Sequence, residues 1–355
     1  MAHHVFIGAA AFAGAANGAG TAPGGLYRLD GDSGRVTRLA GGLPEPIEPR
    51  CVAVAPGQPN VVYVGTQAGV WRSGDAGDTW TALAPLPGAA QRVWSLHLPA
   101  GEPQAVYAGA EGTTVYRSRD GGTTWTELTP PAPRGMVSMN FPCRVIRLAA
   151  DTADPRHLYA ALEVGGLMRS RNGGDSWEGC NDDLLAFTDE PRLKSRIISD
   201  TETEGMMDSH ALAVSPAAPG TVFLANRMGL WRSADGGAHW REVGIGRFSP
   251  LTYARDVRVS RHDPRTMYAA LSVAAFSDTG SLYRSGDLGE TWQRIDHGVD
   301  MTSTLMVIAE SPSDRDRLWC ATRGGQVIGT ADGGRSWREH RLPDGADGVY
   351  ALAAA

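Results

Sequence analysis

The chain has 355 residues, a net charge of −6 at neutral pH and 42% hydrophobic residues. Basic and acidic side chains are mixed along it, without the basic run typical of a nucleic-acid-binding protein, so nucleic acid is not an expected partner. No stretch is long and apolar enough to span a membrane. The four cysteines lack metal-ligand spacing, so neither a metal nor another cofactor is expected.

The chain begins with a strand-like run at 5–10, a Gly- and Ala-rich loop between 9 and 25, and two further strand-like runs within 24–39. Residues 5–20 have the small-residue composition of a signal peptide, but no basic segment precedes them. The run at 5–10 aligns with the strand-like run at 61–66, so we expect it to belong to the fold. The sequence therefore predicts a cytoplasmic protein.

An octapeptide of the form S-x-D-x-G-x-T-W then returns six times, each copy between two short strand-like runs. The copies lie at 73–80, 118–125, 170–177, 233–240, 285–292 and 330–337, and the third has Asn172 in place of Asp. An Asp in a tight turn accepts hydrogen bonds from nearby backbone N–H groups, and Gly permits a positive φ. The Trp ring is suited to packing against a neighbouring repeat. The octapeptide is therefore predicted to be a structural corner rather than a ligand or metal site.

The octapeptide resembles the Asp-box, also called the BNR repeat, of sialidases, other glycan-cleaving hydrolases, sortilin-type receptors and photosystem II assembly factors. The resemblance extends over nearly the whole chain. It implies a β-propeller in which the Asp-box is a structural corner, and it says little about chemistry.

Four short strands in each repeat are typical of a propeller blade. Six blades are predicted at 50–84, 92–128, 144–178, 210–244, 255–295 and 304–340. Residues 1–40 supply three strands of a seventh blade, and the run at 349–355 supplies its innermost strand. The expected fold is all-β: a single domain, 1–355, forming a seven-bladed β-propeller of four-stranded antiparallel blades. The C-terminal strand closes the ring by joining the N-terminal blade.

A functional site is expected around the central channel, on the face opposite the octapeptide turns. The position four residues before the last apolar residue of each innermost strand holds Arg50, Arg92, Arg144, His210, Arg255, Thr304 and Gly348. Arginines that converge on one axis would bind a carboxylate, sulfate or phosphate through paired hydrogen bonds. This register predicts a small anionic or carbohydrate ligand.

Residues of neighbouring loops complete the predicted substrate-binding set: Glu111, Glu163, Arg227 and Arg323. His210 and Tyr253 are the predicted catalytic residues, because His titrates near neutral pH and Tyr253 precedes Arg255 in the crossing between two blades. In the alternative interpretation, the arginines cap strand starts or pair with nearby carboxylates such as Asp208. The sequence leaves both interpretations open.

The crossing at 178–209 is the longest in the chain and is highly charged. Long loops in compact domains are usually functional or disordered, so this one is a candidate lid over the channel. Its Asp and Glu residues could also bind a cation, but no ligand spacing singles out three of them. The crossing at 129–143 is the second longest and neighbours it.

Two functions are compatible with these features. The first is a carbohydrate-active enzyme, a glycoside hydrolase or a uronate lyase, that holds an anionic substrate with the arginines and moves protons with His210 and Tyr253. The resemblance to sialidases implies hydrolysis, but the chain has no F-R-I-P run near its N-terminus. The second is a non-catalytic propeller that docks a protein partner through an arginine-lined face, as the resemblance to photosystem II assembly factors implies.

Overall fold

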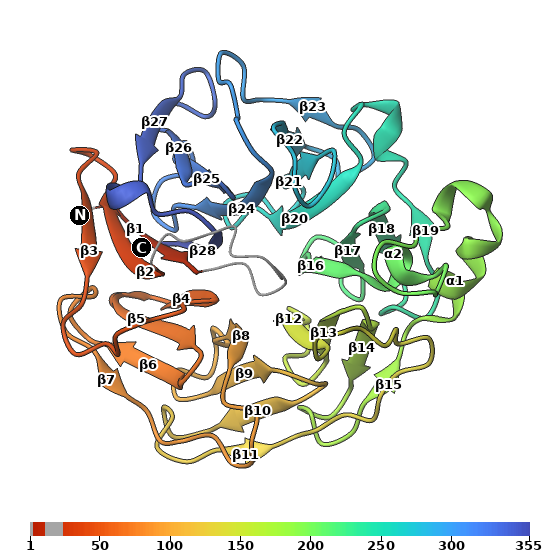
Figure 1. Ribbon diagram of the computed structural model, residues 1–355, viewed down its shortest axis with the longest axis horizontal. Helices are drawn as coiled ribbons and strands as arrows, with labels where there is room; N and C mark the ends of the chain where they lie inside the picture. The colour runs from red at the N-terminus through yellow and green to blue at the C-terminus, as the bar shows by residue number, and fades with distance from the viewer. Residues whose placement is uncertain (1–2, 11–23) are drawn as a thin grey trace.

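Seven four-stranded antiparallel sheets surround a central axis in the computed structural model, which describes residues 3–10 and 24–355 (Figure 1). The predicted all-β, seven-bladed propeller is confirmed. Most of the Gly- and Ala-rich loop expected between 9 and 25 lies outside the described residues. Each blade has its innermost strand beside the channel, and adjacent innermost strands contact one another around the ring.

The first four blades in chain order comprise the following strands. Blade 1 contains β28 (Val349–Ala354), β1 (His4–Ala9), β2 (Gly25–Asp30) and β3 (Val36–Leu39). Blade 2 contains β4 (Cys51–Ala55), β5 (Gln58–Thr66), β6 (Gly69–Ser73) and β7 (Thr81–Ala82). Blade 3 contains β8 (Val93–His97), β9 (Val106–Ala110), β10 (Val115–Ser118) and β11 (Thr126–Glu127). Blade 4 contains β12 (Arg144–Ala150), β13 (Leu158–Glu163), β14 (Gly166–Ser170) and β15 (Glu178–Gly179).

The remaining three blades have the same order from channel to rim. Blade 5 contains β16 (Ser209–Val214), β17 (Val222–Asn226), β18 (Gly229–Ser233) and β19 (Arg241–Glu242). Blade 6 contains β20 (Tyr253–Val259), β21 (Met267–Ser272), β22 (Gly280–Ser285) and β23 (Gln293–Arg294). Blade 7 contains β24 (Leu305–Glu310), β25 (Leu318–Thr322), β26 (Gln326–Thr330) and β27 (Arg338–Arg341).

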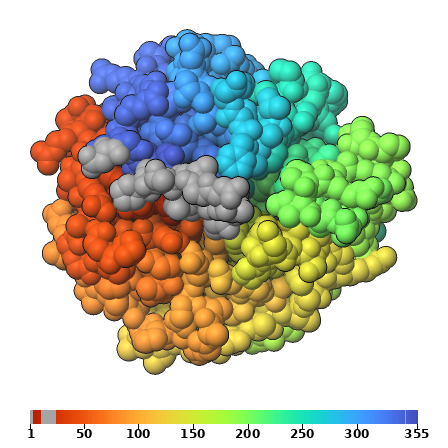
Figure 2. Space-filling view, viewed as in Figure 1, coloured from red at the N-terminus to blue at the C-terminus, as the bar shows by residue number. Residues whose placement is uncertain are grey.

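The long crossing from blade 4 to blade 5 is a folded segment, visible in light green in Figures 1 and 2. Its short helices are α1 (Asp182–Ala186), η1 (Phe187–Asp189), η2 (Pro191–Leu193) and α2 (Glu204–Met207). Several of its apolar side chains, among them Leu184, Leu193 and Met206, are buried in one cluster with residues of blades 4 and 5. This burial holds the segment against blades 4 and 5, so the segment is an insertion that packs on the propeller. Two other crossings contain η3 (Ile245–Arg247) and η4 (Pro343–Gly345).

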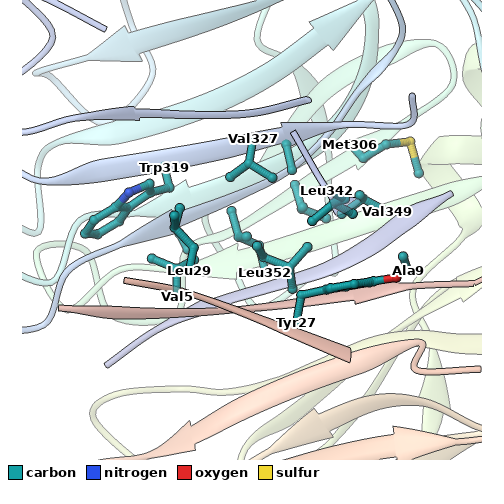
Figure 3. Close-up of a cluster of buried hydrophobic side chains, with 14 of the residues drawn as sticks. Val5, Ala9, Tyr27, Leu29, Met306, Trp319, Val327, Leu342, Val349 and Leu352 are labelled. Carbon is teal, nitrogen blue, oxygen red and sulfur yellow. The ribbon is translucent and has the colours of Figure 1, made fainter. Parts of the chain in front are cut away.

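The two chain ends close the ring, because β28 pairs antiparallel with β1 over five residue pairs, including Ile7 with Leu352. Figure 3 shows the apolar cluster beside this junction, in which Val5, Leu29 and Leu352 meet Trp319 of blade 7. Such a closed ring leaves no unpaired inner strand at its junction. The closure predicted from the split seventh repeat is therefore confirmed.

The octapeptide forms the turn between the third and fourth strands, and its Asp holds that turn. In blade 3, the Asp120 carboxylate accepts hydrogen bonds from the Thr124 N–H at 2.8 Å and the Thr124 hydroxyl at 2.6 Å. The Thr124 hydroxyl and then its N–H lower the pKa of Asp120 to about 2. In blade 4, Asn172 Oδ1 accepts the Ser176 N–H and Asn172 Nδ2 donates to the Ser176 hydroxyl, both at 2.9 Å. The Asn172 amide thus makes hydrogen bonds to the same two groups of residue 176, although it donates to the hydroxyl instead of accepting from it.

Removal of residues 349–355 is expected to lower the midpoint of the whole unfolding transition, since the innermost strand of blade 1 and the ring junction disappear together. Thermal unfolding followed by far-ultraviolet circular dichroism measures the effect. Addition of a synthetic 349–355 peptide in trans should restore part of the lost stability. An unchanged midpoint in the truncated protein would show that closure contributes nothing.

Asp235→Ala is expected to lower the free energy of unfolding by about 1 kcal/mol, the usual loss for a side chain that caps backbone N–H groups. The Asp235 carboxylate accepts the His239 N–H at 2.9 Å and the Ser233 hydroxyl at 2.7 Å. Asp235→Asn is the matched control, because Asn172 already does this work in blade 4. Urea unfolding should therefore rank wild type and Asp235→Asn together, above Asp235→Ala. The opposite ranking would point to a role for the negative charge itself.

Candidate functional site

Irregularities in the innermost strands aim a ring of side chains at the channel. Six of these strands contain a β-bulge near their start, where one residue has no partner in the neighbouring strand. A bulge re-aims the extra side chain and is frequent near functional sites. The bulged residues are Trp94, Ile146, His210, Arg255, Met306 and Tyr350. Arg50, one residue before β4, completes the ring at the equivalent position of blade 2.

All seven of these residues line one cavity of about 140 Å³, which we name the arginine pocket. Residues from neighbouring loops and strand ends complete its wall, among them Phe141, Arg144, Glu163, Ile198, Asp208, Arg227, Tyr253, Ala275 and Arg323. The two longest crossings thus reach the pocket through Phe141 and Ile198. The pocket lies at the starts of the innermost strands, at the opposite end of the blades from the octapeptide turns.

The structure corrects the register that the sequence predicts for the arginines. Arg50 and Arg255 occupy the inward-aimed ring, but Arg92 and Arg144 lie two residues before it, at the level of Asp208 and Tyr253. The last apolar residue is a poor landmark, because β12 continues through Ala149 and Ala150 beyond the residue taken as its end. Tyr253 is also the first residue of β20 and is not part of the crossing.

Two predicted residues, Arg92 and Glu111, do not line the pocket. Arg92 pairs with Glu48 in a short contact and with Glu111 at 3.3 Å. Glu111 forms an isolated β-bridge with Arg144. For Arg92, the alternative interpretation, pairing with nearby carboxylates, is therefore the observed one. The other predicted site residues line the pocket: Arg50, Arg144, Glu163, His210, Arg227, Tyr253, Arg255 and Arg323.

The pocket has an excess of positive charge, with six arginines against the carboxylates of Glu163 and Asp208. Glu163 lies 2.6 Å from Arg144 Nη1, and Asp208 lies 2.6 Å from Arg227 Nη2. Within residues 3–10 and 24–355, the Arg255 guanidinium has no hydrogen bond and no ion pair. Arg255 therefore presents free donors to whatever occupies the cavity.

Aromatic rings hold two other arginines in place. The Arg50 guanidinium stacks against the rings of Trp94 at 4.9 Å and Tyr350 at 4.6 Å. The Arg144 guanidinium lies 4.2 Å from the centroid of the Trp94 ring and 4.5 Å from that of the Phe141 ring. Such cation–π contacts fix a guanidinium while leaving its edge donors available. These aromatic residues were missed in the sequence, although Trp94 and Tyr350 occur in innermost strands beside the residues chosen.

His210, Asp208 and Tyr253 form a buried polar cluster in the pocket wall. His210 Nδ1 lies 2.7 Å from the Ala254 carbonyl oxygen, which can only accept, so Nδ1 carries the proton. Nε2 of the neutral ring is then free to accept from the Tyr253 hydroxyl at 3.3 Å. Burial lowers the pKa of His210 from its ordinary value of 6.5, against the opposing effect of Asp208. The neutral, basic form of the imidazole is therefore favoured at neutral pH.

Asp208 completes this cluster as a carboxylate. Its Oδ2 lies 3.3 Å from His210 Nε2 and 2.6 Å from Arg227 Nη2. Burial alone would raise its pKa, but His210 and Arg227 outweigh that effect and hold the pKa well below the usual range. Asp208 is therefore placed to stabilise an imidazolium whenever His210 Nε2 gains a proton.

In the part of the chain that the structure describes, no group of three His, Cys, Asp or Glu side chains has the geometry to hold a metal ion. Within the same residues, no helix has both the length and the apolar character needed to cross a membrane.

The chain matches no protein-family profile. Over 174 residues it is 25% identical to xyloglucanase Xgh74A of Acetivibrio thermocellus, covering 42% of this chain and 19% of that protein. Its fold is similar to the GH74 xyloglucanase from Xanthomonas campestris, with a TM-score of 0.64 and 19% identity over 86% of this chain and 46% of that one. It is also similar to YCF48 bound to D1 peptide, with a TM-score of 0.51 and 14% identity over 85% and 86%.

These comparisons establish the fold alone. The chain spans less than half the length of both xyloglucanases. Its structural neighbours include both glycoside hydrolases and YCF48 bound to a peptide, so they are compatible with a carbohydrate ligand and with a protein partner.

Arg255→Gln is expected to weaken the binding of a small carboxylate ligand, glucuronate, by about 1.5–3 kcal/mol, the usual contribution of a hydrogen bond to a charged group. Arg92→Gln is the matched control. Arg92 lies directly before an innermost strand, but its side chain pairs with Glu48 and Glu111 and does not line the pocket. Isothermal titration calorimetry measures both. If both variants lost the same binding free energy, the inference that Arg255 contacts the ligand and Arg92 does not would be contradicted.

Proposed function

We propose that the protein is a carbohydrate-active enzyme that binds a carboxylate-bearing sugar in the arginine pocket and cleaves it by β-elimination, as a uronate lyase does. The observation that carries this proposal is the 3.3 Å contact between the Tyr253 hydroxyl and His210 Nε2. It joins a proton donor to a neutral base within the same cavity as Arg255. A lyase needs these two functions together with a cation that neutralises the substrate carboxylate.

The three roles can be assigned to separate groups. Arg255 binds the carboxylate, and its positive charge stabilises the additional negative charge that develops when the adjacent C–H proton is removed. His210 Nε2 takes that proton. The electron pair of the broken C–H bond forms the new C=C bond, and the glycosidic C–O bond breaks. The Tyr253 hydroxyl gives its proton to the departing oxygen. Transfer of a proton from His210 Nε2 to the Tyr253 oxygen then restores both residues.

Asp208 supports this assignment of His210 as the base. When Nε2 gains a proton, the new N–H can donate to Asp208 Oδ2, which lies 3.3 Å away. Arg227 holds the same oxygen at 2.6 Å and so fixes its position. The charge that appears on the imidazole during the reaction therefore meets an ionised partner that is already in place.

The carboxylates are less well suited to glycoside hydrolysis by an acid and a base. That mechanism needs one carboxyl group that stays protonated near neutral pH. Asp208 has its pKa held well below the usual range, and Glu163 forms an ion pair with Arg144 at 2.6 Å. The environment of Asp208 thus favours its ionised form. Elimination by His210 and Tyr253 does not require proton transfer by either carboxylate.

Docking of a protein partner is the second candidate function. Near the pocket, Ile197, Ile198, Val273 and Phe276 expose 59–65% of their surface. Ile198 and Ala275 line the pocket itself, and Phe276 lies 4.5 Å from the Arg323 guanidinium. An apolar rim around a positive cavity would also suit an acidic peptide segment. The similarity in fold to YCF48 bound to D1 peptide supports this alternative.

His210→Ala and Tyr253→Phe are each expected to abolish formation of the unsaturated product while leaving substrate binding largely intact, because proton transfer contributes mainly in the transition state. The measurement is ultraviolet absorbance of the C=C bond formed during incubation with uronate-containing oligosaccharides. Since His210 must be neutral to act and burial lowers its pKa below 6.5, activity should persist at pH 6.5 and fall only at lower pH.

Ile197→Ser separates the two functions. Ile197 is 59% exposed and does not line the pocket. The lyase proposal predicts unchanged kcat/KM for this variant, whereas docking predicts weaker capture of acidic peptides. Failure of all uronate oligosaccharides to bind or react would reject the enzyme proposal and favour the docking function.

A further inference from the structure

The channel contains a second cavity, of about 300 Å³, which we name the second chamber. It is lined by six of the innermost strands, β4, β8, β12, β20, β24 and β28. Pro56, Leu98 and Arg261 lie at its far end, where the first and second strands of a blade are joined. In an antiparallel blade, those turns share a face with the octapeptide turns. The second chamber therefore opens away from the arginine pocket.

A partition separates the two cavities. Six residues line both: Arg50, Trp94, Ile146, Arg147, Val307 and Tyr350. The aromatic rings of Trp94 and Tyr350 are 6.3 Å apart, and the Arg50 guanidinium is stacked on both. The remaining lining residues of each cavity do not line the other, so ligands in the two cavities would share contacts only with these six residues.

The second chamber also carries more positive than negative charge. The side chains of Arg147, Arg258 and Arg261 line it. Asp256, which is fully buried, accepts from Arg147 Nη2 at 3.0 Å and from Arg258 Nε at 2.9 Å. Among the described residues that line the chamber, Glu310 is the only one with a carboxylate, and Asp256 is not a lining residue.

Both carboxylates already accept hydrogen bonds from other groups. Asp256 also accepts the backbone N–H groups of Val257 at 3.0 Å and Ile308 at 2.9 Å. Glu310 accepts the Ser260 hydroxyl and the Arg261 N–H, both at 2.6 Å. Asp256 accepts four hydrogen bonds in all and thus has few lone pairs left for further arginine donors.

Several of those donors have nothing to bind. Within residues 3–10 and 24–355, no hydrogen bond or ion pair engages the Arg261 guanidinium or the two Nη atoms of Arg258. Arg147 Nε and His97 Nε2 are buried and have no hydrogen-bond partner among the same residues. Burial, and then the like charge of Arg258, lower the pKa of Arg147 to about 10. Unfilled donors around a net positive cavity are the chemistry of an anion site.

We propose that the second chamber is a separate binding site for a small oxyanion, of the phosphate or sulfate class. Arg147, Arg258 and Arg261 would donate to its oxygens, and His97 Nε2 would provide a further polar contact. Guanidinium groups match the spacing of oxyanion oxygens through paired N–H donors. The site uses residues outside the proposed catalytic set, so it does not rest on the proposed function.

The test is calorimetric titration with inorganic phosphate in a buffer free of other oxyanions. It is done in an Arg255→Gln background, which weakens any phosphate binding in the arginine pocket. Phosphate should bind this variant, and adding Arg261→Gln should weaken that binding by about tenfold or more. Arg261→Lys should weaken it less, since it retains the charge but loses the forked donors.

Arg261 is the residue of choice because its side chain forms no hydrogen bond or ion pair among the described residues, so its replacement leaves the fold undisturbed. Melting temperatures without phosphate check this for each variant. Absence of phosphate binding in the Arg255→Gln background, or equal affinity with and without Arg261→Gln, would overturn the proposal. Because the lyase assay reports on the arginine pocket, its failure would be distinguishable from either result.

Discussion

The pairing of β28 with β1 is the contact on which both the ring and its site depend. It joins segments at opposite ends of the chain, and the close approach needs a small residue in β1, because a Cβ on Gly8 would lie 3.1 Å from the Ala351 Cβ of β28. The same strand β28 carries the bulged Tyr350, whose ring stacks with Arg50 of blade 2. The strand that closes the fold thus also completes the pocket and the partition of the channel.

Bulges convert this regular ring into a site. Repeated innermost strands would otherwise present similar faces to the channel, whereas a bulge turns one chosen side chain of each strand inward. Six blades use it at the same level, and they place an imidazole, a guanidinium, two aromatic rings and two aliphatic chains there. Because the side chains at this level differ from blade to blade, a fold built from similar repeats can hold a single reaction centre.

The fold was predictable from the sequence because its signals are local. Each octapeptide contains the Asp or Asn, the Gly and the Trp that its own turn uses, so the six turns identify six blades. The strand-like runs within 1–40 and 349–355 identify the seventh blade. The site was only partly predictable, because its contacts join distant segments. Arg92 meets Glu48, 44 residues earlier in the chain, and no feature near Arg92 indicates that contact. The bulges were also hidden, since sequence periodicity assumes strict alternation.

The arrangement of charge explains why two cavities remain distinct in one channel. Among residues 3–10 and 24–355, carboxylates pair with some of the arginines around each cavity, and at least one guanidinium has no hydrogen bond or ion pair: Arg255 in the arginine pocket and Arg261 in the second chamber. Between the cavities, Arg50 is stacked on aromatic rings and is only 4% exposed. Arg255 is partly buried and Arg261 is exposed, so each guanidinium can donate to an anion that enters its cavity. Because stacked rings separate the two cavities, each can hold a different anion.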